Sequence, residues 1–139
     1  MCKAKRTDTG EWVKGYLWQG SDFTLIIPHN LGIDYDEQSS RMKAVAYPVD
    51  KETLCKRCPD SPVTTKTIWE NDVFEYEGET AIVRYGRYHN PFENANTYHV
   101  GFYLDWQNNC LRKDLEYWVN DPECKLLGNR FDSENARGR

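Results

Sequence analysis

The sequence predicts a mainly β protein with small barrel-like sheets and a short helical segment near its C-terminal end. Aromatic residues make up 14% of the 139 residues, and aromatic and β-branched side chains favour sheets. Residues 11–18 and 98–106 alternate in the manner of strands, and residues 68–86 surround a tight turn. The length fits one domain. We therefore expect a single domain over 1–139, with 133–139 frayed.

The clearest element is the hairpin within residues 68–86. Apolar residues flank the pair Glu77 and Gly78 on both sides, and glycine supplies the backbone angles that a two-residue hairpin turn requires. An acidic turn precedes the β-branched Val73, a pattern that often starts a strand in small barrels of the SH3 type. This hairpin is the central one along the sequence and points to a β-rich domain.

Other segments predict further strands. Residues 11–18 and 23–28 form a second expected hairpin, in which Pro28 ends the ladder. A clean alternation over 98–106 places these apolar side chains on one face: Tyr98, Val100, Phe102, Leu104 and Trp106. A short strand is expected from Met42 to Tyr47. The sheet therefore draws on most of the chain.

One helix and several loops complete the expected fold. Apolar residues recur at helical spacing in 111–119, and Pro122 follows soon after. Residues 125–131 predict a final strand. The polar and turn-rich segments predict loops or a surface crossing at 29–42, 50–67 and 87–97. Lys3, Lys5 and Arg6 are expected at a solvated strand edge.

Charge and hydropathy limit the functional classes. The chain has 18 basic and 22 acidic residues, a formal charge of −4, so no global attraction to phosphate or to anionic lipid is expected. No apolar run approaches the roughly 20 residues of a membrane span, and the start of the chain lacks the apolar stretch of a secretory signal. We expect an intracellular protein without membrane contact.

The cysteines point to no cofactor. Five cysteines in a chain without an export signal predict mostly reduced thiols. Cys55 and Cys58 form a C-x-x-C, which fits half of a zinc site or a redox pair. No second such motif follows, and the context of a thioredoxin-like motif is missing. Two surface thiols in a turn are the favoured interpretation, so neither metal nor cofactor is predicted.

The sequence gives no sign of an active site. It contains no G-x-S-x-G, no H-E-x-x-H and no phosphate-binding glycine loop. Its acidic pairs lie in turn-like segments, where carboxylates commonly accept from backbone amides. We therefore expect no catalytic residues and a non-enzymatic role.

Aromatic residues are more numerous than one small core requires. They include Trp12, Trp18 and Trp69, which are candidates for a subunit interface. The strongest local cluster of aromatic and basic side chains is a candidate binding surface: Arg84, Tyr85, Arg87, Tyr88 and His89. Such a cluster suits a protein interface, and it also suits single-stranded nucleic acid. The acidic net charge favours the protein interface.

Four segments occur in an order that carries a family resemblance. They are AKRTDTGEWVKGY at 4–16, VDKET at 49–53, IWENDV at 68–73 and LLGNRFD at 126–132. Together they resemble the YopX family, whose members are small products of phage and prophage genomes. The resemblance covers nearly the whole chain, although residues 56–65 and the residues after Asp132 depart from the family pattern.

The resemblance implies a single YopX-like domain with a mainly β fold, a tendency to self-associate and no established activity. It also implies a setting in the cytoplasm of a bacterial host. The leading hypothesis is a non-catalytic, homo-oligomeric accessory protein that binds a host protein or a component of a defence system. The alternatives are a single-strand nucleic-acid binder and a protein that sequesters a small molecule between subunits.

Overall fold

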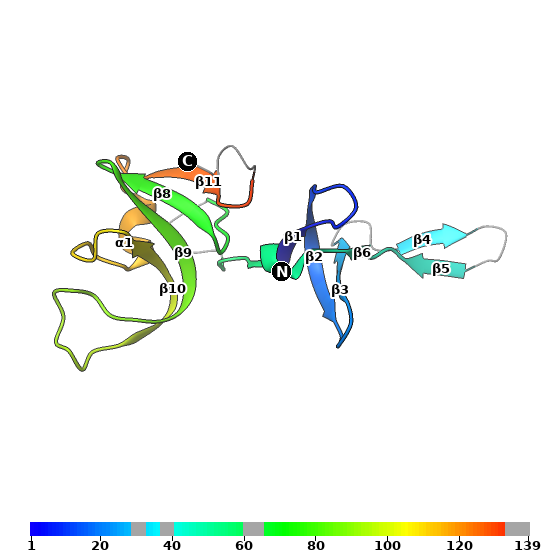
Figure 1. The fold of residues 1–139 in the computed structure, drawn as a ribbon, viewed down its shortest axis with the longest axis horizontal. Helices are drawn as coiled ribbons and strands as arrows, with labels where there is room; N and C mark the ends of the chain where they lie inside the picture. Colours follow the sequence, from blue (N-terminus) through cyan, green and yellow to red (C-terminus); the bar gives the residue numbers. More distant parts are fainter. Residues whose placement is uncertain (29–32, 37–40, 60–65, 133–139) are drawn as a thin grey trace. The chain divides into compact units, whose positions relative to one another are not determined.

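The fold is mainly β. The structure, a computed structural model, describes residues 1–28, 33–36, 41–59 and 66–132. These contain two antiparallel sheets, a two-stranded ribbon and one short α-helix, which confirms the predicted fold class at this level (Figure 1). The chain divides into two compact units, Met1–Arg57 and Cys58–Arg139. The expectation of one domain over 1–139 stays a prediction.

The first unit contains a five-stranded sheet in the order β6-β3-β2-β1-β7. Its strands are β1 (Cys2–Lys5), β2 (Trp12–Gln19), β3 (Thr24–Pro28), β6 (Tyr47–Pro48) and β7 (Cys55–Lys56). The predicted hairpin of β2 and β3 is confirmed. The core of this sheet is formed by Cys2, Ala4, Val13, Ile26 and Val49.

Strand β1 corrects the expectation of a solvated edge. It lies between β2 and β7, and Lys3 is only 7% exposed. The Lys3 ammonium nitrogen lies 4.3 Å from the centre of the Trp12 ring, so a cation–π contact accompanies the burial of this lysine. Because charged and small residues alternate in β1, the sequence did not predict that this strand lies inside the sheet.

Two short strands replace part of a predicted loop. Strands β4 (Ile33–Asp36) and β5 (Arg41–Ala44) pair antiparallel, where the sequence predicted a loop over 29–42 and a strand over 42–47. The rest of that loop, 29–32 and 37–40, lies outside the described residues. Charged and apolar residues alternate in both strands, but each run is only four residues long and lies in a segment rich in turn-forming residues, so the sequence pattern did not predict them.

The second unit contains a four-stranded antiparallel sheet in the order β10-β9-β8-β11. Its strands are β8 (Asp72–Tyr76), β9 (Glu79–Tyr88), β10 (His99–Trp106) and β11 (Lys125–Asn129). The predicted turn between β8 and β9 is confirmed, since Glu77 and Gly78 have φ values of 49° and 81°, the two positive angles of a type I′ turn. β9 and β10 form a long curved hairpin (Figure 1).

The core of the second unit lies between one face of this sheet and the helix α1 (Leu115–Val119). It includes Phe74, Val83, Leu104, Trp106 and Trp118. The helix is shorter than the predicted 111–119, because the residues before it extend the sheet: Leu104 N donates to Lys113 O at 2.9 Å, and Asp114 forms a bridge with Tyr103.

A buried polar network fastens the start of β8 to β11. Asp72 accepts from Trp69 N at 2.8 Å and from Asn129 Nδ2 at 2.9 Å. Asn129 Nδ2 also donates to Glu70 O at 3.0 Å, and Arg130 N donates to Asn71 O. Buried polar groups are stable only when they are paired. Two of the four segments that resemble YopX proteins are thus bound to each other.

The sheets in the described part of the chain are open. Each order begins and ends with a different strand, β6 and β7 in one sheet and β10 and β11 in the other. The barrel part of the expectation is therefore not confirmed. Residues 60–65 of the predicted surface crossing and the tail 133–139 lie outside the described residues.

Candidate functional site

The outer end of the β9–β10 hairpin bends at a pair of glycines. Gly86 and Gly101 lie directly opposite each other, with φ values of 153° and 158°. A Cβ at either position would meet nothing within 4 Å, so glycine is needed for its backbone angle and not for space. The paired glycines therefore form a bend across both strands.

Ring contacts show how tightly the hairpin curls. Tyr88 and Arg84 are four residues apart on β9, roughly 13 Å along an extended strand, and Tyr103 lies opposite Arg84. Yet the rings of Tyr88 and Tyr103 stack with their centres 4.9 Å apart. The hairpin is thus concave on the face of Tyr88 and convex on the opposite face.

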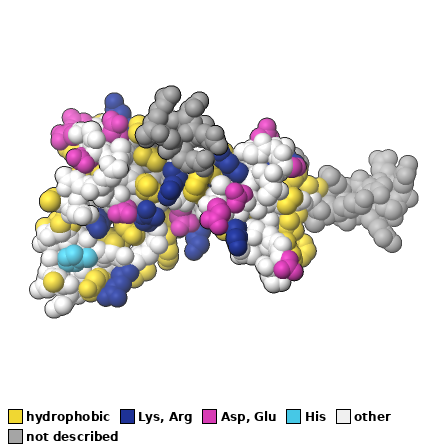
Figure 2. All heavy atoms as spheres, in the orientation of Figure 1, with side chains coloured by type: hydrophobic (Ala, Val, Ile, Leu, Met, Phe, Trp, Pro, Cys, Tyr) yellow, Lys and Arg dark blue, Asp and Glu magenta, His cyan; other side chains and the backbone are white. Residues whose placement is uncertain are grey.

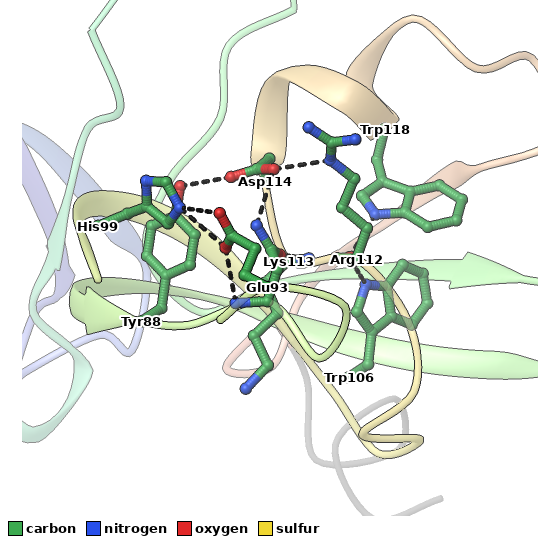
Figure 3. A network of polar contacts seen from close by, with 9 residues as sticks. Tyr88, Glu93, His99, Trp106, Arg112, Lys113, Asp114 and Trp118 are labelled. Atoms are coloured by element: carbon green, nitrogen blue, oxygen red, sulfur yellow. Dashed lines mark hydrogen bonds and ion pairs between the residues drawn. The ribbon is translucent and has the colours of Figure 1, made fainter. Parts of the chain in front are cut away.

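Asp114 is the centre of a polar network on the concave face (Figure 3). Its carboxylate accepts from Tyr88 Oη at 2.7 Å, from Asn90 Nδ2 at 3.0 Å and from Arg112 Nε at 2.7 Å. Asn90 is itself buried, and its Oδ1 accepts from Lys113 N at 2.7 Å. The network fixes the end of β9 to the segment that extends the sheet beyond β10.

Glu93 fastens the connecting loop to the same face. Its carboxylate oxygens lie 2.9 and 2.8 Å from His99 Nε2, and Asn90 N donates to it at 3.1 Å. The ring of His99 also stacks on Tyr88. On the same loop, His89 Nδ1 lies 2.6 Å from Thr97 O. Both ends of the loop are therefore anchored.

The network changes the acidity of its members. Burial would raise the pKa of Asp114, but the hydrogen bonds from Tyr88, Arg112 and Asn90 outweigh it and the pKa is lowered. The hydrogen bond with His99 is the main cause that lowers the pKa of Glu93. Burial, together with the Asp114 carboxylate, raises the pKa of Tyr88. Tyr88 therefore remains a neutral donor to an ionised Asp114.

The polar groups of this network form their hydrogen bonds with one another. A histidine beside a carboxylate is an arrangement that general bases use, but in the described part of the chain no hydroxyl or thiol bonds to His99. Asp114 already accepts three hydrogen bonds. The indole nitrogens of Trp106 and Trp118 both donate to Arg112 O. The geometry therefore supports a bracing role for the network.

The convex face carries an exposed apolar and basic surface, which we name the tip face. It consists of the exposed Tyr85, Arg87, Tyr98 and Val100 and of the half-buried Phe102, which also packs against the core of the unit. Val100 is 73% exposed, and the Arg87 guanidinium lies 3.6 Å from the centre of the Tyr98 ring. Hydrophobic and basic side chains lie together on the surface of this hairpin (Figure 2). Exposed aromatic and arginine side chains are typical of protein-binding surfaces.

The structure divides the predicted cluster between the two faces. Tyr85 and Arg87 belong to the tip face, whereas Tyr88 belongs to the network. Arg84 also lies on the concave side, where it pairs with Asp105 at 2.7 Å, and His89 is engaged with the loop. Because neighbouring residues of a strand point to opposite faces, the alternation itself could have predicted this division.

The three candidate interface tryptophans have different surroundings. Trp69 is 5% exposed, so its side chain is not available on the surface of its unit. Trp12 is half-buried beneath Lys3. Trp18 is exposed and contacts Phe23 edge-on. Of the three, Trp18 best fits the expectation of an interface.

The expectation of two surface thiols at the C-x-x-C motif is wrong for Cys55. Cys55 is buried, with its Sγ 3.2 Å from Thr53 O. Cys58 is half-buried and packs against the core of the second unit. Among the residues that the structure describes, no group of three or more His, Cys, Asp or Glu side chains could hold a metal ion.

Sequence reasoning missed the residues that brace the hairpin. Asn90, Glu93 and Asp114 carry no motif, and the hydrogen bond between Asn90 and Asp114 spans 24 residues. Their only signal is the sequence Lys113-Asp114 before a helical pattern, which resembles an ordinary helix start. Only the folded chain brings these groups together.

Comparison of the chain with models of protein families, with curated proteins and with solved structures gives no match. Within the described ranges, no helix combines the length and the apolar character that a bilayer crossing requires.

Proposed function

We propose that the protein is a YopX-like accessory protein of a phage or prophage, non-catalytic and homo-oligomeric, which acts by binding another protein in the cytoplasm of a bacterial host. Modulation of that host protein or of a defence system is the role we assign to the binding. The finer fold assignment, a small YopX-like barrel, is part of the same proposal. It rests on the four segments that carry the resemblance.

The tip face carries the proposal. Val100 and Tyr98 are large exposed apolar side chains on a sheet surface, beside an ordered arginine. Tyrosine and arginine are among the residues most enriched at the energetic centres of protein interfaces. This surface lies on the convex side of the bend at Gly86 and Gly101.

Preorganisation supports a binding role. The concave side of the hairpin is fixed through Asp114 and Glu93, so the convex side needs little ordering when a partner binds. A surface that is already ordered loses less conformational entropy in a complex. The network therefore serves the tip face without contacting the partner.

The segments that resemble YopX proteins have structural roles in this chain. Residues 68–73 and 126–132 meet in the network of Asp72 and Asn129. Residues 4–16 and 49–53 meet through Thr53, whose Oγ1 accepts from Lys5 N at 2.8 Å. These contacts give the four segments a role in folding, and the proposal places partner binding on the β9–β10 hairpin.

An affinity capture from bacterial lysate tests the binding role with two matched variants. Val100→Glu places a charge on the tip face, whereas Leu127→Glu places one at an exposed apolar position on β11 of the same unit. We expect the wild-type chain and Leu127→Glu to retain the same protein and Val100→Glu to lose it. Retention by Val100→Glu would show that another surface binds.

Light scattering tests self-association separately. We place the subunit contact at the exposed pair of Trp18 and Phe23, because aromatic side chains of this size favour burial. The wild-type chain should have the mass of more than one subunit at micromolar concentration, and Trp18→Glu should have the mass of one. A monomeric wild-type chain would contradict the homo-oligomer.

Single-stranded nucleic acid remains the second candidate, because Tyr85 and Arg87 offer a ring and a cation on one face. Stacking on such rings contributes about 1–3 kcal/mol per base. A labelled oligonucleotide should then bind at low salt and be released by Tyr85→Ala or by added salt. Absence of binding at low salt would remove this candidate.

A further inference from the structure

We infer that the tip face receives an acidic, apolar peptide segment, in which a carboxylate contacts Arg87 and neighbouring apolar side chains cover Val100. This inference rests on the proposed protein-binding role and names the chemistry of the partner. Its starting point is the difference between Arg87 and other arginines of the same unit.

Arg87 has no carboxylate partner in the described part of the chain, in contrast to two arginines nearby. Arg84 pairs with Asp105 and Arg112 pairs with Asp114, each at 2.7 Å. The contact made by Arg87 is with the ring of Tyr98. Its charge is therefore available to a partner.

The contact with Tyr98 leaves the hydrogen-bonding capacity of Arg87 intact. At 3.6 Å the guanidinium carbon lies over the ring, so the cation–π contact uses the face of the group. The N–H donors of a guanidinium lie in its plane and match the two oxygens of a carboxylate. Tyr98 thus orients the Arg87 guanidinium so that its in-plane N–H donors can bind both oxygens of a carboxylate.

The surroundings of Arg87 select against other occupants. A wholly apolar partner would bury the arginine without a counter-charge, which is costly. A second copy docked by the same face would bring arginine and no carboxylate, because the tip face contains no acidic residue. A phosphate backbone needs a series of free cations, and Arg84 and Arg112 are already neutralised.

A random peptide library displayed on yeast tests the inference, with the labelled full-length chain as the probe. We expect the enriched peptides to contain Asp or Glu next to aromatic or aliphatic residues. Arg87→Gln should weaken their binding roughly tenfold or more, the value of a charge-assisted hydrogen bond, and Arg87→Lys should weaken it less. Arg84→Gln is the matched control, because that arginine is already paired.

Several outcomes would overturn the inference. Enriched peptides without acidic residues, equal binding by Arg87→Gln and the wild-type chain, or no enrichment at all would each contradict it. So would binding of oligo-dT that is lost in Arg87→Gln. If peptides without acidic residues bind and Val100→Glu abolishes that binding, the protein-binding function stands and only the partner chemistry is wrong. Circular dichroism of each variant shows that the fold is kept.

Discussion

Asp114 illustrates how one side chain can position a surface that it does not touch. It lies at the N-terminal end of α1, where its side chain makes no capping hydrogen bond to the helix. Its oxygens accept from Tyr88, Asn90 and Arg112 instead. The Asp114 carboxylate therefore stabilises the hairpin and does not cap the helix.

Removal of this carboxylate should destabilise the second unit. Asp114→Ala leaves the buried Asn90 amide and the Tyr88 hydroxyl without their acceptor, which should lower the free energy of unfolding by about 2 kcal/mol. Asp105→Ala, which breaks an exposed pair on the same sheet, should cost about 0.5 kcal/mol. Urea unfolding followed by tryptophan fluorescence measures both. Equal losses would mean that the network does not brace the hairpin.

Acid should weaken the same network. The pKa values of Asp114 and Glu93 are lowered in the folded protein, so near and below their ordinary values of 3.8 and 4.5 the unfolded chain binds more protons. Stability is then present above those values and is lost as the pH falls. The urea concentration at the midpoint of unfolding should be lower at about pH 3 than at about pH 6. Glu93→Gln should show a smaller drop, and a drop as large as that of the wild type would exclude a role for Glu93.

The β9–β10 hairpin carries the polar network on one face and the tip face on the other. Its inner half carries the core residues Val83 and Leu104, and its outer half carries Tyr85 and Phe102 on the same face. The bend at Gly86 and Gly101 lies beyond Tyr85 and Phe102 and separates them from Arg87 and Val100. The alternation of side chains along β9 and β10 therefore places core residues on one face of the hairpin, and the tip face continues along that same face.

Glycine at the bend should be required for its backbone angle. Gly101→Ala should lower the free energy of unfolding by about 2 kcal/mol, since a side chain disfavours this conformation. Val100→Thr, at the exposed neighbouring position, should change it by less than about 0.5 kcal/mol. Nuclear magnetic resonance should also show that the stacked rings of Tyr88 and Tyr103 separate in Gly101→Ala. An unchanged ring contact would mean that the bend has another cause.

Local patterns predicted the elements better than their connections. The turn at Glu77 and Gly78 and the alternation of β10 were readable because both depend on neighbouring residues. The central position of β1 was not readable, because the burial of Lys3 depends on Trp12, which a different strand supplies. The sequence predicted the candidate cluster at 84–89, but grouping these residues together did not take into account that successive side chains of a strand point to opposite faces. That alternation divides the cluster between two faces.

At the scale of the whole chain, two compact units each combine a core with an exposed aromatic surface. The first unit presents Trp18 and Phe23 at the end of its β2–β3 hairpin. The second presents the tip face at the end of its β9–β10 hairpin. We assign self-association to the first surface and partner binding to the second, so that each can be removed by a single substitution.

Hydrogen exchange of the full-length chain, with and without a peptide selected on it, tests the central claim most directly. The account predicts slower exchange in Tyr98–Phe102 and Tyr85–Arg87 when the peptide is bound, and no such change in Val100→Glu. Binding that slows exchange in the hairpin of Trp18 and Phe23 while the tip face is unchanged would contradict it.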